Sequence, residues 1–194
     1  HLNGTAQIAR VDVLGYRLER RSLLGLTIRE KDRTLSVVAK LVRPDKGGLL
    51  FDLLQELEKK GFNSSATDGI DVPHPIEYAP EGILWLEKVS NPSLHELIET
   101  EEYVSGCRRA GEVLQKLQGL SIQNLPVHTY EEAFAQLKEW ADETARIYPA
   151  LKQSIQSVLE ELEKSVPNVE PEAVQPVHRD FYDSQLLQTR QGWA

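Results

Sequence analysis

A short polar stretch near the end of the chain carries the residues best suited to chemistry. In "PVHRDFYDSQLL", residues 176–187, the side chains of His178, Asp180 and Gln185 stand between short apolar runs. A carboxylate on a rigid loop can orient an incoming hydroxyl or accept its proton. A nearby amide oxygen can face a bound cation, because hard divalent cations prefer oxygen ligands. The same triplet also fits a solvated loop with a local aspartate hydrogen bond, so the residue types alone leave both interpretations open.

A lysine in the N-terminal half is a second candidate. Lys40 lies in "VVAKLV", the centre of a predicted strand, where lysine is disfavoured unless it has a specific role. The alternative is an edge-strand lysine that prevents aggregation. Glu56 follows on a predicted helix and is a candidate ion-pair partner for Lys40. Glu58 lies close to it, and both carboxylates could instead be solvated.

The composition limits the classes of protein to consider. The chain has 194 residues, a net charge of −8 and 40% hydrophobic residues, which is typical of a soluble globular protein. The acidic balance argues against nucleic acid as the main partner, because phosphate binding needs clustered Lys and Arg. No apolar run reaches the length of a membrane span, and no signal peptide opens the chain. A single cysteine, Cys107, excludes an intrachain disulfide and favours a half-buried thiol in a cytoplasmic protein.

The first half of the chain is predicted to be rich in strands. Residues 8–43 carry strand signals, and "RSLLGLTI" and "TLSVVAKLV" around the polar turn "REKDR" predict an antiparallel hairpin. A helix is predicted in "LLFDLLQELEKKG", with Gly61 as its C-terminal cap. "IEYAPEGILWLEKV" predicts two more short strands around a Pro-Glu-Gly turn.

Near residue 90 the apolar pattern changes from period 2 to period 3.6. Three amphipathic helices are predicted, in "RRAGEVLQKLQGL", in "TYEEAFAQLKEWADETARIY" and from Leu151 to Leu162, with their apolar stripes buried as core. Thr129 and Glu132 have the spacing of a capping box. The sequence therefore predicts an α+β, bilobal fold. Residues 1–88 would form an antiparallel-sheet lobe, and residues 89–194 a mostly helical lobe that holds the polar loop 176–187.

The order of these features resembles a known family. A strand lysine, a helix glutamate, a hinge such as "ILWLEKVSNPSLHELI" and then H-x-D-x-x-x-x-N/Q is the layout of the aminoglycoside phosphotransferase and choline kinase superfamily. These proteins are small-molecule kinases with a protein-kinase-like fold. "VHRDFYDSQLL" is similar to the family's "HGDFHPGNVL" loop, and "RRSLLGLTI…VVAKLVRPDKGG" is similar to its first hairpin. The resemblance covers essentially the whole chain, and its most specific part is the loop.

The resemblance implies a role for each candidate residue. Asp180 would be the catalytic aspartate that orients the acceptor hydroxyl, Gln185 would take the place of the metal-binding Asn, and His178 would be structural. Lys40 would hold the α- and β-phosphates of ATP or GTP, with Glu56 fixing its ammonium and Mg²⁺ neutralising charge. Such a site works mainly by positioning and charge neutralisation. The hinge residues that would offer backbone groups to the purine are Leu86, Glu87, Lys88 and Val89.

The sequence also departs from the family pattern. Gly15 and Gly25 do not form a G-x-G-x-x-G loop, and Gln185 replaces Asn. The family's second metal-binding Asp would fall beyond Ala194, so the chain is expected to be truncated before that ligand and inactive as given. We therefore expect a phosphotransferase that acts on a hydroxyl of a small molecule. The alternative is a catalytically inactive kinase-like binding or regulatory module. A protein kinase is a weaker alternative, because the short helical half offers no platform for a peptide. The sequence specifies neither the acceptor nor the oligomeric state.

Overall fold

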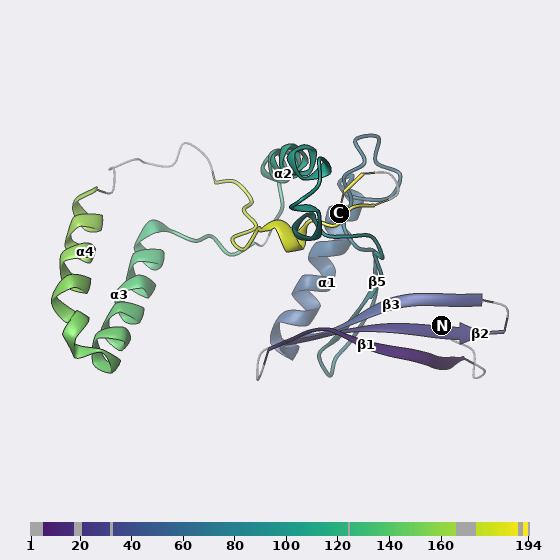
Figure 1. Ribbon diagram of the computed structural model, residues 1–194, viewed down its shortest axis with the longest axis horizontal. Helices are drawn as coiled ribbons and strands as arrows, with labels where there is room; N and C mark the ends of the chain where they lie inside the picture. Colours follow the sequence, from purple (N-terminus) through teal and green to yellow (C-terminus); the bar gives the residue numbers. More distant parts are fainter. Residues whose placement is uncertain are drawn as a thin grey trace. The chain divides into compact units, whose positions relative to one another are not determined.

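The computed structural model describes residues 6–17, 21–31, 33–123, 125–165, 174–189 and 192–193. Three strands, one helix and two more strands come first, and helices follow, which confirms the α+β class with an antiparallel sheet and a helical second half (Figure 1). The strands are β1 (Gln7–Arg17), β2 (Arg21–Glu30), β3 (Arg33–Leu41), β4 (Pro75–Ala79) and β5 (Ile83–Glu87). The α-helices are α1 (Pro44–Lys59), α2 (Glu102–Gln118), α3 (Tyr130–Ile147) and α4 (Lys152–Ser165). Short 3₁₀ helices are η1 (Leu94–Leu97), η2 (Pro149–Leu151) and η3 (Asp183–Gln185).

The chain divides into two compact units. The first unit comprises residues 1–120 and 177–194, and the second comprises residues 121–176. The predicted lobe boundary between residues 88 and 89 falls inside the first unit and stays a prediction. Among the residues that the structure describes, no helix is both long and apolar enough to cross a membrane.

The first unit is built on a five-stranded antiparallel sheet with the strand order β1-β2-β3-β5-β4. The predicted hairpin is β2–β3, and the predicted Pro-Glu-Gly turn joins β4 to β5. Gly82 in that turn has a φ of 97°, and a Cβ there would lie 2.5 Å from the Val42 carbonyl oxygen, so the turn requires glycine. The sequence pattern did not single out β1, because register shifts beside Ile8 and Val13 interrupt its alternation.

The two faces of the sheet carry different clusters. One face carries a cluster to which α1 contributes: Val38, Leu84 and Leu86 of the sheet, with Leu50, Phe51 and Leu54 of the helix. The opposite face carries Leu26, Ile28 and Ala39, with Trp85 beside them. Side chains alternate along a strand, and directly paired residues share a face. Lys40 pairs with Leu23 and Leu84, so it lies on the α1 face. The helix ends as predicted, with Gly61 just beyond it at a φ of 94°.

A third cluster joins α2 to the polar loop near the end of the chain. Leu94, Leu97, Leu186 and Trp193 are its buried members, and Phe181 packs against them. Trp193 also forms a parallel bridge with Ile70, and its N–H donates to the Gly69 carbonyl oxygen at 2.9 Å. The last described residues therefore lie beside the loop before β4 (Figure 1). The prediction of a half-buried thiol was wrong, because Cys107 is exposed on α2.

Lys116 of α2 holds the loop between α1 and β4. Its ammonium donates to the Gly61 carbonyl oxygen at 2.6 Å and to the Ile70 carbonyl oxygen at 3.1 Å. The same Nζ atom lies 2.8 Å from the Asp68 carboxylate and 4.4 Å from the centre of the Phe62 ring. Only 19% of the Lys116 side chain is exposed. This set of contacts fixes the loop against α2.

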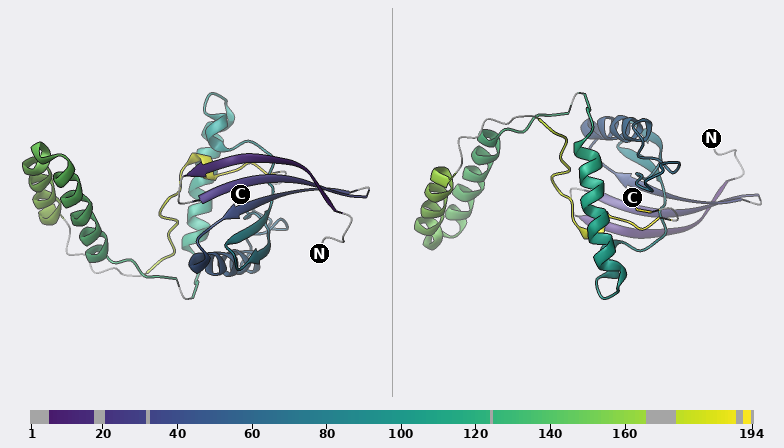
Figure 2. Two further views of the ribbon diagram at one scale, coloured as in Figure 1. Left: turned by 90° about the horizontal axis from the view of Figure 1, so that it is seen from below. Right: turned by 90° about the horizontal axis from the view of Figure 1, so that it is seen from above.

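The second unit is a hairpin of α3 and α4, which run side by side (Figure 2). The predicted capping box is present, since the Glu132 N–H donates to Thr129 Oγ1 at 3.2 Å. The prediction that all the apolar stripes are core was wrong here. Phe134 is the buried residue of α3, whereas Trp140 is 61% exposed. Two helices bury one shared seam, and the remaining apolar width of each stripe stays in contact with solvent.

Candidate active site

The polar loop is fixed by backbone pairing to the segment that follows the hinge. The Leu94 N–H donates to the Leu186 carbonyl oxygen at 2.8 Å, and the Gln188 N–H donates to the Pro92 carbonyl oxygen at 3.0 Å. Ser93 and Leu187 form the antiparallel bridge between these bonds. Leu186 is 1% exposed, so the bonded backbone is anchored in the core. The loop is therefore held at its C-terminal end by a short two-stranded strap, residues 92–94 and 186–188.

Within the loop, the side chains of Asp180 and Gln185 come together. Gln185 Nε2 donates to Asp180 Oδ2 at 3.5 Å, the long end of a hydrogen bond. The approach follows from η3, where the Gln185 N–H donates to the Tyr182 carbonyl oxygen at 2.9 Å and turns the chain back. Asp180 is exposed and Gln185 is half-buried. This contact uses Nε2 of the amide and does not involve the amide oxygen Oε1.

The backbone is strained immediately before Asp180. Arg179 has a φ of 61°, in the left-handed region, which costs a non-glycine residue about 1 kcal/mol. This conformation accompanies a tight turn in which the Asp180 N–H donates to the His178 carbonyl oxygen at 2.8 Å. Strain of this kind is concentrated at functional sites. The His178 ring is exposed and meets the Phe181 ring edge-on at 5.4 Å, and Phe181 packs on the Leu186 cluster. The structural role of His178 stays a prediction.

A histidine that the sequence did not single out contacts this loop. His95 Nδ1 of η1 lies 2.9 Å from Asp183 Oδ2, at the first residue of η3. The hydrogen bond from His95 lowers the pKa of the Asp183 carboxyl below its usual value, and a hydrogen bond from Ser184 acts in the same direction. No local sequence signal marks His95, because its partner lies 88 residues away in the sequence.

The structure places Lys40 and Glu56 on neighbouring elements. Lys40 is half-buried on the α1 face of β3, and Glu56 lies on α1. The Glu56 carboxylate lies 3.6 Å from the Lys60 ammonium, one helical turn along the helix. The predicted ion pair between Lys40 and Glu56 stays a prediction.

Glu58 is the α1 carboxylate on the side of the sheet. It follows Leu54 by four residues and Phe51 by seven, so it continues the stripe that packs on the sheet. Its side chain is 22% exposed, against 35% for Glu56. Glu58 Oε1 lies 2.6 Å from Nδ1 of His74, the residue before β4. The positions of the packed apolar residues show that Glu58 is on the side of α1 that faces the sheet. Its spacing from Lys40 in the sequence gives no such indication.

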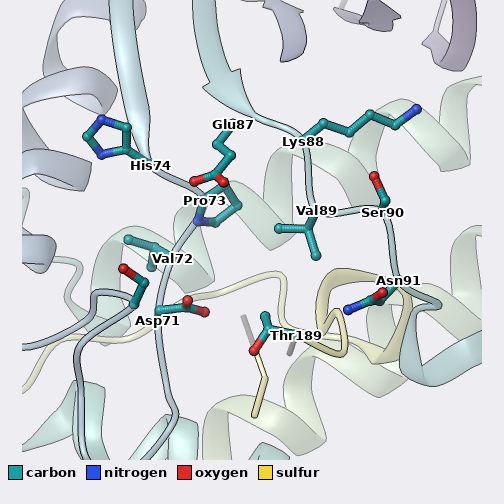
Figure 3. A pocket seen from close by; sticks show the side chains of 11 residues that line it. Asp71, Val72, Pro73, His74, Glu87, Lys88, Val89, Ser90, Asn91 and Thr189 are labelled. Carbon is teal, nitrogen blue, oxygen red and sulfur yellow. The ribbon is translucent and has the colours of Figure 1, made fainter. Parts of the chain in front are cut away.

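A cavity of about 410 Å³ lies beside the predicted hinge (Figure 3). Glu87, Lys88 and Val89 line it, whereas Leu86 is buried in the cluster under α1. The other lining residues are Ser64, Asp71, Val72, Pro73, His74, Ser90, Asn91 and Thr189. Asp71 Oδ1 is buried without a hydrogen-bond partner in the described part of the chain. Burial raises the pKa of Asp71, and the Glu87 carboxylate raises it further.

Comparison with known proteins identifies the fold. No protein-family model matches the sequence, and no curated protein matches it. Among solved structures, the chain is similar to the spectinomycin phosphotransferase APH(9)-Ia, whose crystal structure contains ADP and spectinomycin. The TM-score is 0.58 at 12% sequence identity, over 95% of this chain. The chain has the protein-kinase-like fold of an aminoglycoside phosphotransferase.

This likeness confirms the predicted fold and the predicted resemblance at the level of architecture. The matched region spans 61% of the solved phosphotransferase chain. At 12% identity the likeness concerns the fold alone. The roles of Asp180, Gln185, Lys40 and the hinge residues are therefore taken up below as proposals.

Proposed function

We propose that the protein is a small-molecule kinase that transfers the γ-phosphate of a nucleoside triphosphate to a hydroxyl group of its substrate. One observation carries the proposal. Asp180 is exposed beside Gln185 on a loop that the core holds in place, in a chain with the fold of an antibiotic phosphotransferase. The Asp180 carboxylate would accept a hydrogen bond from the acceptor hydroxyl and orient it toward the phosphate. It would take the hydroxyl proton as the new O–P bond forms.

The donor atoms present fit Mg²⁺. Gln185 offers an amide oxygen, a hard ligand of the kind that Mg²⁺ prefers. No group of three or more His, Cys, Asp or Glu that could hold a metal occurs in the described ranges. Mg²⁺ in nucleotide sites commonly uses one or two protein ligands and completes its shell with waters and phosphates. Bound there, Mg²⁺ would neutralise charge on the phosphates.

The nucleotide would lie along the α1 face of the sheet. Lys40 is half-buried on that face and would hold the α- and β-phosphates. The backbone of residues 86–89 would meet the purine at the end of β5. An α1 carboxylate would keep the lysine in place. Glu56 is the residue that the family layout implies, and Glu58 lies on the side of the sheet. The variants Glu56→Gln and Glu58→Gln distinguish them, because loss of the true partner weakens triphosphate binding.

The proposal is tested by turnover and nucleotide binding in the full-length protein, with a panel of hydroxylated acceptors that includes spectinomycin. Asp180→Asn should lower turnover by about 10²- to 10⁴-fold, because a positioned base contributes that much. Nucleotide affinity should remain near the wild-type value, since the nucleotide is held elsewhere. Gln185→Ala should raise the Mg²⁺ concentration needed for half-maximal turnover. Ser184→Ala is the matched control on the same turn, because its exposed hydroxyl bonds only to Asp183 among the described residues, at 3.4 Å.

Two results would contradict the proposal. Near-wild-type turnover by Asp180→Asn would make the loop structural. Tight nucleotide binding without turnover for any acceptor would indicate the inactive kinase-like module instead.

A further inference from the structure

The Lys88 ammonium reaches beneath β2 on the same face of the sheet as Lys40. Lys88 follows β5 by one residue, and its N–H donates to the Ser36 carbonyl oxygen at 3.3 Å, so it continues the pairing with β3. Because side chains alternate, Lys88 shares its face with Leu86. Lys88 Nζ lies 3.3 Å from the point that a Cβ on Gly25 would occupy. Figure 3 shows the side chain extended away from the other labelled residues of the cavity.

This ammonium has donor capacity that the described residues do not use. Lys88 is half-buried, and its ammonium has no hydrogen-bond or ion-pair partner among the residues that the structure describes. Asp12 pairs with Gly25 and so points to the same face, but its carboxylate lies 2.8 Å from the Arg10 guanidinium. Glu87 points to the opposite face, because it is adjacent to Lys88. A half-buried charge is costly unless it is paired, which points to a ligand as its partner.

Lys88 lies at the point along the sheet where the base of a nucleotide would lie if its phosphates were at Lys40. Glu87 at the hinge pairs with Val37, and Gly25 pairs with Val38. Lys40 lies two residues further along β3, which is about 7 Å at the rise of a strand. A nucleotide with its phosphates at Lys40 and its base toward the hinge would place the base beneath Gly25. This placement rests on the proposed function.

We propose that Lys88 selects a 6-oxopurine nucleotide, GTP, over ATP. Guanine presents the O6 and N7 acceptors on one edge, whereas adenine presents an amino donor in place of O6. A lysine ammonium has three donors and no acceptor. Lys88 would donate to O6 and N7 of guanine. Adenine keeps the N7 acceptor, but its amino group would face the ammonium as a second donor and would stay unpaired. Leu14 Cδ1 lies 3.2 Å from the same point beside Gly25 and supplies an apolar surface for the ring.

Calorimetric titration of the full-length protein with Mg²⁺ and GTP, ITP or ATP tests this inference. ITP retains O6 but lacks the 2-amino group, so it isolates the acceptor that Lys88 would contact. GTP and ITP should bind about tenfold more tightly than ATP, in the range expected for one good base contact. Lys88→Met should abolish that difference by weakening GTP and ITP alone, and Lys88→Arg should keep most of it. Lys59→Met is the control, because Lys59 is exposed at the end of α1.

The possible outcomes separate the inference from the proposed function. Equal or tighter binding of ATP by the wild-type chain would overturn the role of Lys88 and leave the kinase proposal standing. Tight binding of GTP with weak binding of ITP would assign the selectivity to the 2-amino group and would also overturn it. Equal loss of all three nucleotides in Lys88→Met would show that the ammonium meets the phosphates. Absence of nucleotide binding to the wild-type full-length protein would refute both proposals. Circular dichroism melting confirms that each variant is folded.

Discussion

Gly106 is the point at which α2 comes closest to the segment that holds the polar loop. A Cβ at Gly106 would lie 2.4 Å from Leu94 Cδ1 and 3.0 Å from the Trp193 ring. Ordinary carbon contacts are about 3.5–4.0 Å, so Leu94 would have to move by about 1 Å. Leu94 and Trp193 are only 3% and 7% exposed, which leaves little room for such a movement. Gly106→Ala should therefore strain the core beneath the strap.

The magnitude follows from two opposing terms. Overpacking a well-packed core costs about 1–3 kcal/mol, and replacing glycine by alanine inside a helix regains about 1 kcal/mol. Gly106→Ala should therefore destabilise the first unit by about 0–2 kcal/mol. Gly111 lies on the same helix, and nothing lies within 4 Å of the Cβ it would gain. Gly111→Ala should stabilise the unit by about 1 kcal/mol. The difference of about 1–3 kcal/mol between the two variants isolates the packing term.

Urea unfolding followed by tryptophan fluorescence measures this difference. A Trp140→Phe background limits the signal to Trp85 and Trp193, which belong to the first unit. Because Leu94 also donates to the loop backbone, Gly106→Ala should increase amide exchange at Leu94, and Gly111→Ala should not. The reasoning is refuted if the two variants have equal stability, since the close contact would then carry no energy.

Three further outcomes are expected. Lys116→Met should destabilise the first unit by about 1–3 kcal/mol in urea unfolding, because two buried carbonyl oxygens lose their donor. Lys138→Met should cost less than about 1 kcal/mol, since that lysine has a similar ring contact but an exposed ion pair; equal costs would contradict the argument. Asp71→Asn should stabilise the protein at neutral pH. Because the pKa of Asp71 is raised in the folded state, the folded state binds the proton more tightly than the unfolded state. The wild-type stability therefore falls as pH rises through the unfolded and then the folded pKa. A stability gain of Asp71→Asn that persists below about pH 3 would contradict this. His95→Gln should raise the pKa of Asp183 toward its ordinary value in a carboxyl NMR titration. The wild-type contact contributes stability above the unfolded pKa that is lost as pH falls through the folded pKa, and an unchanged Asp183 titration would remove His95 as the cause.

The sequence predicted those parts of the fold that short-range rules determine. The β2–β3 hairpin and the β4–β5 turn follow from alternation and from Gly82, and the start of α3 follows from the side chain of Thr129. The strand β1 was not singled out, because its register shifts break the alternation that marks a strand. The prediction of a buried Trp140 failed because helical periodicity identifies an apolar stripe but not how much of it a partner covers.

In the candidate site, too, the sequence singled out what lies within one short segment and missed what depends on distant residues. The sequence singled out both Asp180 and Gln185, and one 3₁₀ turn brings their side chains together, but their direct contact was not predicted. His95 could not be found, because its contact with Asp183 joins residues that are 88 positions apart in the sequence. The choice between Glu56 and Glu58 depends on which side of α1 meets the sheet, which becomes clear only when the packed residues are known.

The strap of residues 92–94 and 186–188 has a consequence for how the protein is made. Its two halves are separated in the chain by α2 and by the whole second unit. Closing so long a loop is slow, and contacts of large sequence separation form late in folding. During synthesis, the sheet and α1 can fold while residues 186–188 are still inside the ribosome. Until Leu186 and Trp193 are available, Leu94 and Leu97 form an exposed apolar surface that chaperones can bind. A nascent chain therefore has a folded sheet well before the strap fixes the polar loop.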